Sequence, residues 1–243
     1  MRRLYYITAG LAVLFAVWLA FSLYTYLGRA DDTRETLRQA RLTDRIFASE
    51  DNPVQSAREA MANDDIIAHI YVPGTAISYA VVQAADNEFY LYHDITRRGN
   101  SNGAIFLDYL NSSDFSDRNT IIYGHNRSDG TMFHDIQLFQ DYSFFRGNPY
   151  IIITAEDAVL HYEIFAVFTA HISFNYIRVD FADDYDFLDL LLEIKDRAIH
   201  LRETEITGSD RVLILSTCTN IGLTGRLVLA AKKLDNADTA VIP

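Results

Sequence analysis

The sequence predicts a mainly β fold, a closed or nearly closed β-barrel with peripheral helices, attached to one N-terminal membrane helix. Three observations support this fold class. Between about residues 63 and 235, eight short apolar runs are separated by turn signals, which is typical of an antiparallel barrel or sandwich. One long amphipathic helical pattern interrupts these runs late in the chain. A long uncharged apolar stretch stands at the N-terminus.

The composition is that of a folded, acidic protein. Of the 243 residues, 49% are hydrophobic and 13% aromatic, which is too apolar for a disordered chain. Asp and Glu number 33 against 21 Lys and Arg, which gives a formal charge of −12. An acidic surface argues against non-specific nucleic-acid binding, which needs clustered Lys and Arg. We therefore expect no nucleic-acid partner.

The N-terminal stretch has the features of a signal anchor. Arg2 and Arg3 precede residues 4–27, LYYITAGLAVLFAVWLAFSLYTYL, which carry no charge and are long enough to cross a bilayer as a helix. The positive-inside rule then assigns the N-terminus to the cytoplasm and the rest of the chain to the outside. The alternative is a cleaved signal peptide, but its apolar region is usually shorter and no clear cleavage site follows here. We expect residues 1–30 to be a cytoplasmic tip and an uncleaved, single-pass anchor in the cell membrane.

A charged segment connects this anchor to the barrel. Residues 31–62 are rich in Arg, Glu, Gln and Ala, with apolar residues near helical spacing, and Asn52-Pro53 divides the segment. We expect a helical stalk with a solvated charged face, followed by a second short helix. The barrel then occupies residues 63–235, and residues 236–243 form a tail.

The barrel elements follow in order along the chain. The eight predicted strands are residues 66–72, 77–83, 104–108, 119–124, 149–155, 159–173, 210–218 and 225–234. Helices are predicted at 86–94, with Asp86 or Asn87 as cap, at 131–145 as one or two short helices, and at 183–203. The last helix crosses between the sixth and seventh strands, and its apolar face is formed by Phe187, Leu190, Leu191, Ile194 and Ile199.

Cys218 is the only cysteine of the chain, and it ends the apolar run LILSTC (213–218). Outside a cell, a lone thiol forms no disulfide within its own chain. Three roles remain: a small buried hydrophobe, half of a disulfide between chains, or a nucleophile. Its position at a strand end, next to polar residues, favours the nucleophile without excluding core packing.

A thiol nucleophile is activated by a nearby base, and acyl transfer also needs a group that stabilises negative charge. His125 is a candidate because it lies where the strand NTIIYG (119–124) meets a loop rich in Gly, Asn and Asp. Arg226 opens the last strand, eight residues after Cys218, and a hairpin between them would bring its guanidinium near the thiol. The alternative for Arg226 is a solvated arginine at a strand start.

The other six histidines have weaker claims to function. Two lie inside predicted strands and one lies on the late helix among charges, so a structural or solvated role is favoured for His69, His161 and His200. Three lie near element ends without further support, namely His93, His134 and His171.

Taken together, these motifs resemble those of sortases, the cysteine transpeptidases of the Gram-positive cell surface. LSTC (215–218) is similar to the family's L-x-T-C motif, NTIIYGHN (119–126) to the segment with its histidine, and GRLVLAAKKL (225–234) to its arginine strand. GAIFLDYLNS (103–112), YGHNRSDGTMF (123–133) and the late helix resemble class B members. The resemblance covers roughly residues 63–235 and implies an eight-stranded sortase-type barrel.

The resemblance also implies a reaction and its partners. Cys218 would attack the Thr carbonyl of a C-terminal sorting signal, NPQTN-like in many class B members, and form a thioacyl enzyme. An amine of lipid II or a peptidoglycan cross-bridge would resolve it. His125 would transfer protons and Arg226 would stabilise the oxyanion. No cofactor is implied, and the scattered acidic residues predict no metal site and no required calcium. The candidates for substrate binding are Ser216, Thr217 and Asn126.

Two features depart from the family pattern, and other functions stay open. The family's DYRN reads DYLN here (108–111), and TNIGLTG (219–225) after the cysteine is short and uncharged, so the preferred sorting signal cannot be carried over. A pilin polymerase would use the same residues with a lysine acceptor, and a cysteine protease would use water. A non-catalytic, membrane-anchored binding module would require the three motifs to coincide by chance.

Overall fold

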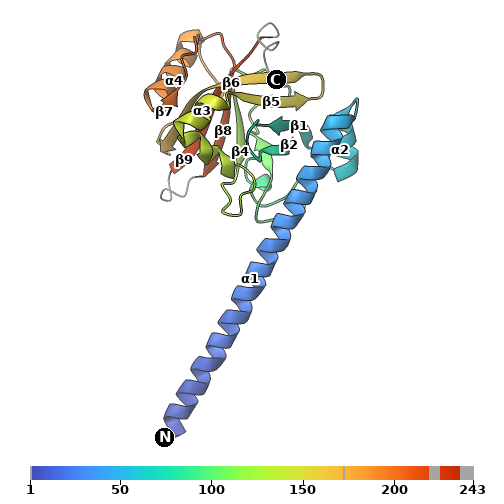
Figure 1. Cartoon of the computed structure of the whole chain (residues 1–243), viewed down its shortest axis with the longest axis vertical. Coiled ribbons are helices and arrows are strands. Elements are labelled where there is room, and N and C mark those ends of the chain that lie inside the picture. Colours follow the sequence, from blue (N-terminus) through green and yellow to red (C-terminus); the bar gives the residue numbers. More distant parts are fainter. Residues whose placement is uncertain (1, 172, 219–224, 236–243) are drawn as a thin grey trace.

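A single long helix leads into the domain. The computed structural model describes residues 2–171, 173–218 and 225–235 (Figure 1). Helix α1 (Arg2–Ser49) is 48 residues long, so the apolar stretch and most of the predicted stalk form one uninterrupted helix. Its first part stands free of the barrel, and its last part lies beside it (Figure 1). Helix α2 (Pro53–Met61) follows the predicted break, with proline in its first turn.

The described residues contain nine strands in one sheet. The order across the sheet is β5-β1-β2-β3-β4-β8-β9-β6-β7. β5 also pairs with β6, so eight strands close into a barrel and β7 is added outside the ring. The predicted mainly β, eight-stranded barrel with peripheral helices is confirmed. The bounds are β1 (Ile66–Tyr71), β2 (Ser78–Val82), β3 (Ile105–Leu107), β4 (Asn119–Gly124), β5 (Tyr150–Ala155), β6 (Val159–His171), β7 (Ala198–Leu201), β8 (Val212–Cys218) and β9 (Gly225–Lys233).

Strand β6 closes the barrel because it is long enough to pair with three neighbours. One of its edges pairs with β9, and the other pairs first with β5 and then with β7. Two pairs are parallel, β2 with β3 and β4 with β8. Parallel neighbours need a long connection, and the chain between β4 and β8 includes β5, β6, helix α4 (Asp184–Asp196) and β7. This connection brings the ends of β4 and β8 together from distant parts of the sequence.

The helix predicted over residues 183–203 ends earlier in the structure. α4 stops at Asp196, and the residues after it form β7, which pairs with β6. The predicted apolar face is buried as far as Ile194. Ile199, however, is 44% exposed on β7, because side chains alternate between the two sides of a strand.

The helix predicted over residues 86–94 is also shorter than expected. Only the 3-10 turn η1 (Phe89–Leu91) is present. Its N-cap residue is Glu88 and not the predicted Asp86 or Asn87, although the Asp86 carboxylate accepts hydrogen bonds from the N–H groups of Glu88 and Phe89. Over residues 131–145, where one or two short helices are predicted, the structure has two, η2 (His134–Gln140) and α3 (Tyr142–Gly147).

Two hydrophobic clusters fix the strands on both faces. One fills the barrel interior and includes Leu213 and Leu215 of β8. The other lies under the helices, where α4 packs on the outside of the barrel, and includes Val212 and Ile214 of β8. β8 is therefore buried on both faces, as expected for a strand with parallel and antiparallel neighbours in the middle of a covered sheet. The strand that ends at Cys218 is held rigidly.

Candidate active site

The ends of β4, β8 and β9 bring the three predicted catalytic residues to one edge of the barrel. β4 runs parallel to β8 with Gly124 opposite Thr217, so His125 and Cys218 are the next residues along these two neighbouring segments. β9 runs antiparallel to β8 with Arg226 opposite Cys218. Opposite residues in such ladders have Cα atoms about 5 Å apart. The backbone of Cys218 therefore lies between those of His125 and Arg226.

His125 is held through its ring and through its backbone. Ring atom Nε2 lies 2.8 Å from the carbonyl oxygen of Leu91, which can only accept, so Nε2 carries the donated proton. The His125 carbonyl accepts a hydrogen bond of 3.0 Å from the N–H of Phe133. The preceding Gly124 leaves no room for a side chain, since a Cβ there would lie 2.5 Å from Ile105 Cδ1. The imidazole thus has one defined orientation.

Arg226 lies over a buried tyrosine. Its guanidinium carbon is 5.8 Å from the ring centroid of Tyr123, which is a cation–π distance. The Tyr123 hydroxyl donates to Asp108 at 2.8 Å, and Asn87 donates to the same carboxylate oxygen at 2.9 Å. Burial, followed by the charge and hydrogen bond of Asp108, raises the pKa of Tyr123. Tyr123 therefore remains a neutral donor, and the network gives Arg226 a rigid support.

A pocket of about 160 Å³ opens beside these groups. Ser216 and Thr217 are buried on β8 and line it. The Ser216 hydroxyl lies 2.8 Å from the Tyr176 hydroxyl, so it is oriented by a partner outside the strands. Asn126, the third predicted substrate-binding residue, is not among the lining residues, and it pairs with Met132 in the loop after β4. The segment 219–224, which links β8 to β9, lies outside the described residues, as does the predicted tail 236–243.

A second pocket of about 200 Å³ continues from the first. The two share Arg226 and Ile177, and the second extends along the segment between β6 and α4 to His171 and Asn175. The shared residues make the two pockets neighbouring parts of one groove. Arg226 lies at their junction.

The other six histidines are not among the residues that line the first pocket. His69 is buried in β1, in keeping with the structural role expected for it. His200 lies on β7 and not on the predicted helix, and its Nε2 donates to the Gln140 carbonyl at 2.8 Å. His171 lines the second pocket. Of the seven histidines, His125 is the one that lines the first pocket.

Several pocket residues are absent from the sequence-based prediction. Asn87, Leu91, Tyr123 and Ile177 all line the first pocket. Tyr123 has a local signal, because it precedes Gly124 and His125 at the end of a predicted strand. The other three lie in turns and irregular segments, where no periodic pattern marks a residue as facing a site.

Known proteins are similar to this chain over most of its length. The Sortase domain family model matches residues 70–234. Sortase B of Listeria monocytogenes is 37% identical over 158 residues, which are 64% of this chain and 63% of that protein. Sortase B of Staphylococcus aureus is 33% identical over 172 residues, 70% of each chain. The chain thus spans slightly less than two thirds of the Listeria relative and slightly more of the Staphylococcus one.

The fold comparison agrees with the sequence comparison. The structure of a Staphylococcus aureus sortase B–substrate complex matches with a TM-score of 0.75 at 28% identity, over 88% of this chain and 99% of that chain. The family match includes the segments that carry Cys218, His125 and Arg226. The chain belongs to the sortase family of cysteine transpeptidases, and its relatives are class B members.

Proposed function

We propose that the protein is a membrane-anchored transpeptidase that cleaves the C-terminal sorting signal of secreted proteins and joins them to a cell-wall precursor amine. The observation that carries this proposal is the register that sets Cys218 between His125 and Arg226. Acyl transfer needs a nucleophile, a proton-transfer group and an oxyanion donor. We assign one of these roles to each of the three residues, and two of them, His125 and Arg226, line a pocket of about 160 Å³.

In the first half-reaction, the Cys218 thiolate forms a C–S bond with the carbonyl carbon of the substrate Thr, and the carbonyl electron pair moves onto oxygen. Arg226 donates hydrogen bonds to this oxyanion and stays charged throughout. His125, as imidazolium, gives its Nδ1 proton to the leaving nitrogen as the C–N bond breaks. We assign Nδ1 to this transfer because Nε2 donates to the Leu91 carbonyl. The products are a thioester and a free peptide amine.

In the second half-reaction, an acceptor amine attacks the thioester carbon while neutral Nδ1 of His125 takes a proton from it. A new amide C–N bond forms, the C–S bond breaks and Cys218 leaves as thiolate. The thiolate and the imidazolium are thereby restored, so the cycle balances with no cofactor. Water in place of the amine would give hydrolysis.

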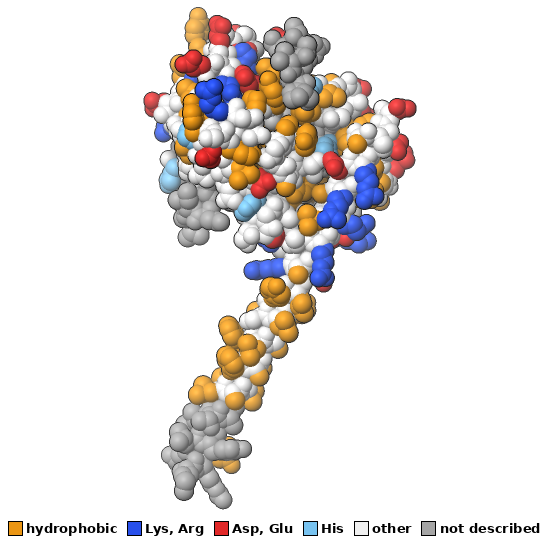
Figure 2. All heavy atoms as spheres, viewed as in Figure 1, with side chains coloured by type: hydrophobic (Ala, Val, Ile, Leu, Met, Phe, Trp, Pro, Cys, Tyr) orange, Lys and Arg blue, Asp and Glu red, His pale blue; other side chains and the backbone are white. Residues whose placement is uncertain are grey.

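Helix α1 is the membrane anchor in this proposal. An 18-residue window of α1 has a mean hydropathy of 1.8, and none of it is buried in the domain. Figure 2 shows apolar side chains along the free part of the helix, where Trp18, Tyr24 and Tyr26 are exposed. A helix without a polar face suits lipid, and aromatic rings suit the membrane interface. We assign the N-terminus to the cytoplasm and the barrel to the outer face of the cell membrane.

The substrate we propose is an NPQTN-like sorting signal. A Staphylococcus aureus sortase B–substrate complex is among the similar structures, which supports a bound substrate for this chain as well. The Thr carbonyl would meet Cys218, and flanking residues would follow the groove formed by the two pockets. The acceptor we propose is an amine of lipid II or of the peptidoglycan cross-bridge, since both are found at the face of the membrane to which we assign the barrel.

The test uses the full chain in detergent with quenched fluorogenic sorting pentapeptides, with and without an oligoglycine or diaminopimelate-type amine. We expect cleavage by wild type and, with the amine, a ligated product in the mass spectrum. Cys218→Ala and His125→Gln should abolish cleavage. His200→Gln is the matched control, because His200 lies on β7 and does not line the pocket. If no peptide is cleaved, or if Cys218→Ala cleaves as wild type does, the transpeptidase proposal fails.

The acceptor arm of this experiment separates the alternatives. A pilin polymerase would ligate a lysine-bearing acceptor peptide and ignore the cell-wall amine. A cysteine protease would give the same products with and without an amine. A Cys218 thiol that resists alkylation in the folded protein would support core packing and a non-catalytic binding module.

A further inference from the structure

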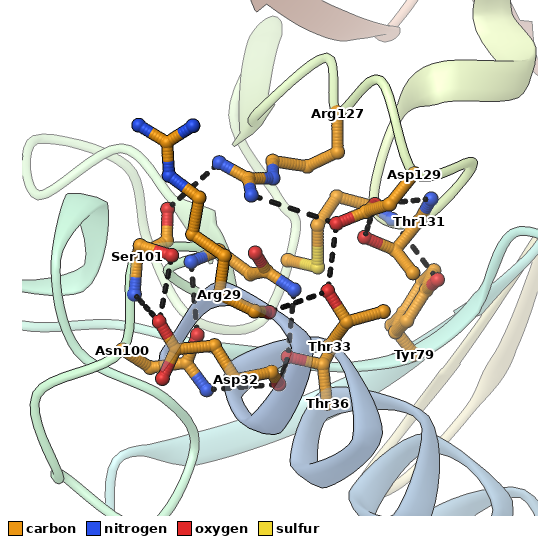
Figure 3. Close-up of polar contacts among 12 residues, drawn as sticks. Arg29, Asp32, Thr33, Thr36, Tyr79, Asn100, Ser101, Arg127, Asp129 and Thr131 are labelled. Atoms are coloured by element: carbon orange, nitrogen blue, oxygen red, sulfur yellow. Dashed lines mark hydrogen bonds and ion pairs between the residues drawn. The ribbon is translucent and has the colours of Figure 1, made fainter. Parts of the chain in front are cut away.

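We infer that α1 positions His125: Asp32 and Thr33, which follow the apolar stretch, hold the two loops that orient the imidazole (Figure 3). The inference rests on the proposed function, because it concerns the proton-transfer group of that reaction. It assigns Asp32, Thr33 and Asp129 as positioning residues, and it gives α1 a role in turnover besides anchoring.

The first loop begins at His125 itself. The N–H of Phe133 donates to the His125 carbonyl at 3.0 Å. The next pair inward, Asn126 and Met132, forms an isolated antiparallel bridge, so the loop is closed at its base. Asp129 stands near the tip. Its Oδ1 accepts hydrogen bonds from the N–H and the hydroxyl of Thr131, at 3.1 and 2.6 Å. A displacement of Asp129 is therefore passed along a short, closed segment to His125.

Thr33 holds this tip from α1. Its hydroxyl lies 2.8 Å from Asp129 Oδ2 and donates to it (Figure 3). Arg127 lies 3.5 Å from the same oxygen and donates to the Ser101 carbonyl at 3.3 Å, which ties the first loop to the second. Burial raises the pKa of Asp129, but hydrogen bonds from Thr131 and Thr33 outweigh burial and hold this pKa below its ordinary value. Asp129 is thus ionised at neutral pH and accepts charge-assisted hydrogen bonds.

Asp32 holds the second loop, which surrounds Ser101. Its Oδ2 accepts hydrogen bonds from both the N–H and the hydroxyl of Ser101, at 3.0 and 2.7 Å (Figure 3). Gly103, in the same loop, has a φ of +63° and packs so closely on η1 that a Cβ would lie 2.8 Å from the Leu91 carbonyl oxygen. That oxygen is the acceptor of His125 Nε2. The second loop therefore supports the hydrogen bond that orients the ring.

Further along the same face of α1, other residues extend the contact. Thr36 accepts from Asn102 at 3.2 Å, and Gln39 donates to buried Asp94 at 2.9 Å. The helix is continuous from its apolar stretch to these contacts. Proton transfer requires the imidazole itself to lie within hydrogen-bond reach, whereas peptide binding is spread over all the pocket walls, of which His125 is only one. Loosening the helix contact should therefore reduce turnover more than it weakens substrate binding.

The test compares Thr33→Val, Thr33→Ser and Thr43→Val in the full chain, in detergent. Valine keeps the shape of threonine but removes the donor to Asp129, and serine keeps the donor. Thr43 is the matched control, because it is fully buried on α1 and its hydroxyl donates to carbonyls of α1 itself. We expect Thr33→Val to lower kcat for peptide cleavage about three- to tenfold, with KM changed less than about twofold. Thr33→Ser should restore kcat, and Thr43→Val should leave it near wild type.

Two results would overturn the positioning role: a kcat of Thr33→Val within about twofold of wild type, or an equal loss in Thr43→Val. Failure of wild type to cleave any peptide would instead overturn the proposed function. In that case, spectra of the protein with ¹⁵N-labelled histidine still decide the inference, with the His125 signals assigned from His125→Gln. They should shift in Thr33→Val and not in Thr43→Val, and unchanged His125 signals in Thr33→Val would refute it.

Discussion

Mild acid should destabilise the fold through one buried histidine. His69 is 5% exposed on β1, where Phe47 of α1 stacks on its ring at 4.8 Å between centroids. Ring atom Nε2 lies 3.2 Å from the Ser78 hydroxyl and 3.8 Å from a carboxylate oxygen of Asp44. Burial lowers the pKa of His69 from 6.5 to about 4, although the charge of Asp44 partly opposes this. The folded protein therefore keeps His69 neutral under conditions where the unfolded chain protonates it.

The size of the effect follows from the two pKa values. Between pH 6.5 and about 4, His69 is protonated in the unfolded state but stays neutral in the folded state. The contribution of neutral His69 to the free energy of unfolding is therefore fully present above pH 6.5 and is lost as the pH falls through this range. Each pH unit corresponds to about 1.4 kcal/mol, so the complete loss is about 3 kcal/mol. That is a large part of the free energy of unfolding of a typical domain, which is about 5–15 kcal/mol.

The assay is urea unfolding of the full chain in detergent, followed by circular dichroism between pH 7 and pH 4.5. His69→Gln removes the titrating group, so its free energy of unfolding should fall about 2 kcal/mol less than that of wild type across this range. Carboxylates that titrate in both proteins cancel in the comparison, and His200→Gln should behave as wild type does. Equal acid losses in wild type and His69→Gln would refute the reasoning.

Three further predictions concern the site and the anchor. Gly103→Ala adds a Cβ 2.8 Å from the Leu91 carbonyl oxygen at a φ of +63°, so it should lower both the free energy of unfolding and kcat. A fully active variant would contradict the role of the Leu91 carbonyl in orienting His125. Tyr176→Phe removes the hydroxyl that lies 2.8 Å from the buried Ser216 hydroxyl, so the free energy of unfolding in urea should fall by about 1–3 kcal/mol. An unchanged urea midpoint would show that this hydrogen bond contributes nothing to stability. The fluorescence of Trp18, the single tryptophan, should be quenched by brominated lipid chains, whereas quenching by aqueous iodide instead would count against a membrane-spanning α1.

Eight of the nine strands in the described residues were predictable because each follows an apolar run bounded by turn residues. The structure differs where local pattern and tertiary pairing compete. Ile199 keeps helical spacing with the apolar face of α4, but residues 198–201 pair with β6 and form β7. That pairing involves a strand about thirty residues earlier, which no local window contains.

The site shows the same division between local and long-range information. Cys218 and Arg226 could be proposed as neighbours because a hairpin joins them in sequence. The position of His125 depends on the parallel pairing of β4 and β8, which the residues alone do not reveal and only the family resemblance suggested. Its ring partner is the backbone carbonyl of Leu91, so no side-chain pattern could have identified it.

The stalk was the least predictable part. Its charged residues suggested a solvated face, and Arg34, Arg38 and Arg41 are indeed exposed. The opposite side of the same turns is buried, including Thr36 and Gln39, because their partners come from loops far along the chain. A polar helix that docks on a domain and one that stands in water have similar sequences.

The unbroken helix α1 also limits the range over which the enzyme can work. Among the described residues, the hydrogen bonds described above from α1 to the barrel begin at Asp32, about five residues after Leu27 ends the apolar stretch, a rise of about 8 Å along a helix. In the proposed membrane-spanning arrangement, this distance is close to the depth of one headgroup layer. The barrel would then work at a nearly constant height above the lipid, without the sweep that a flexible tether allows. Only peptides and amines presented in a thin layer at the bilayer surface would come within reach.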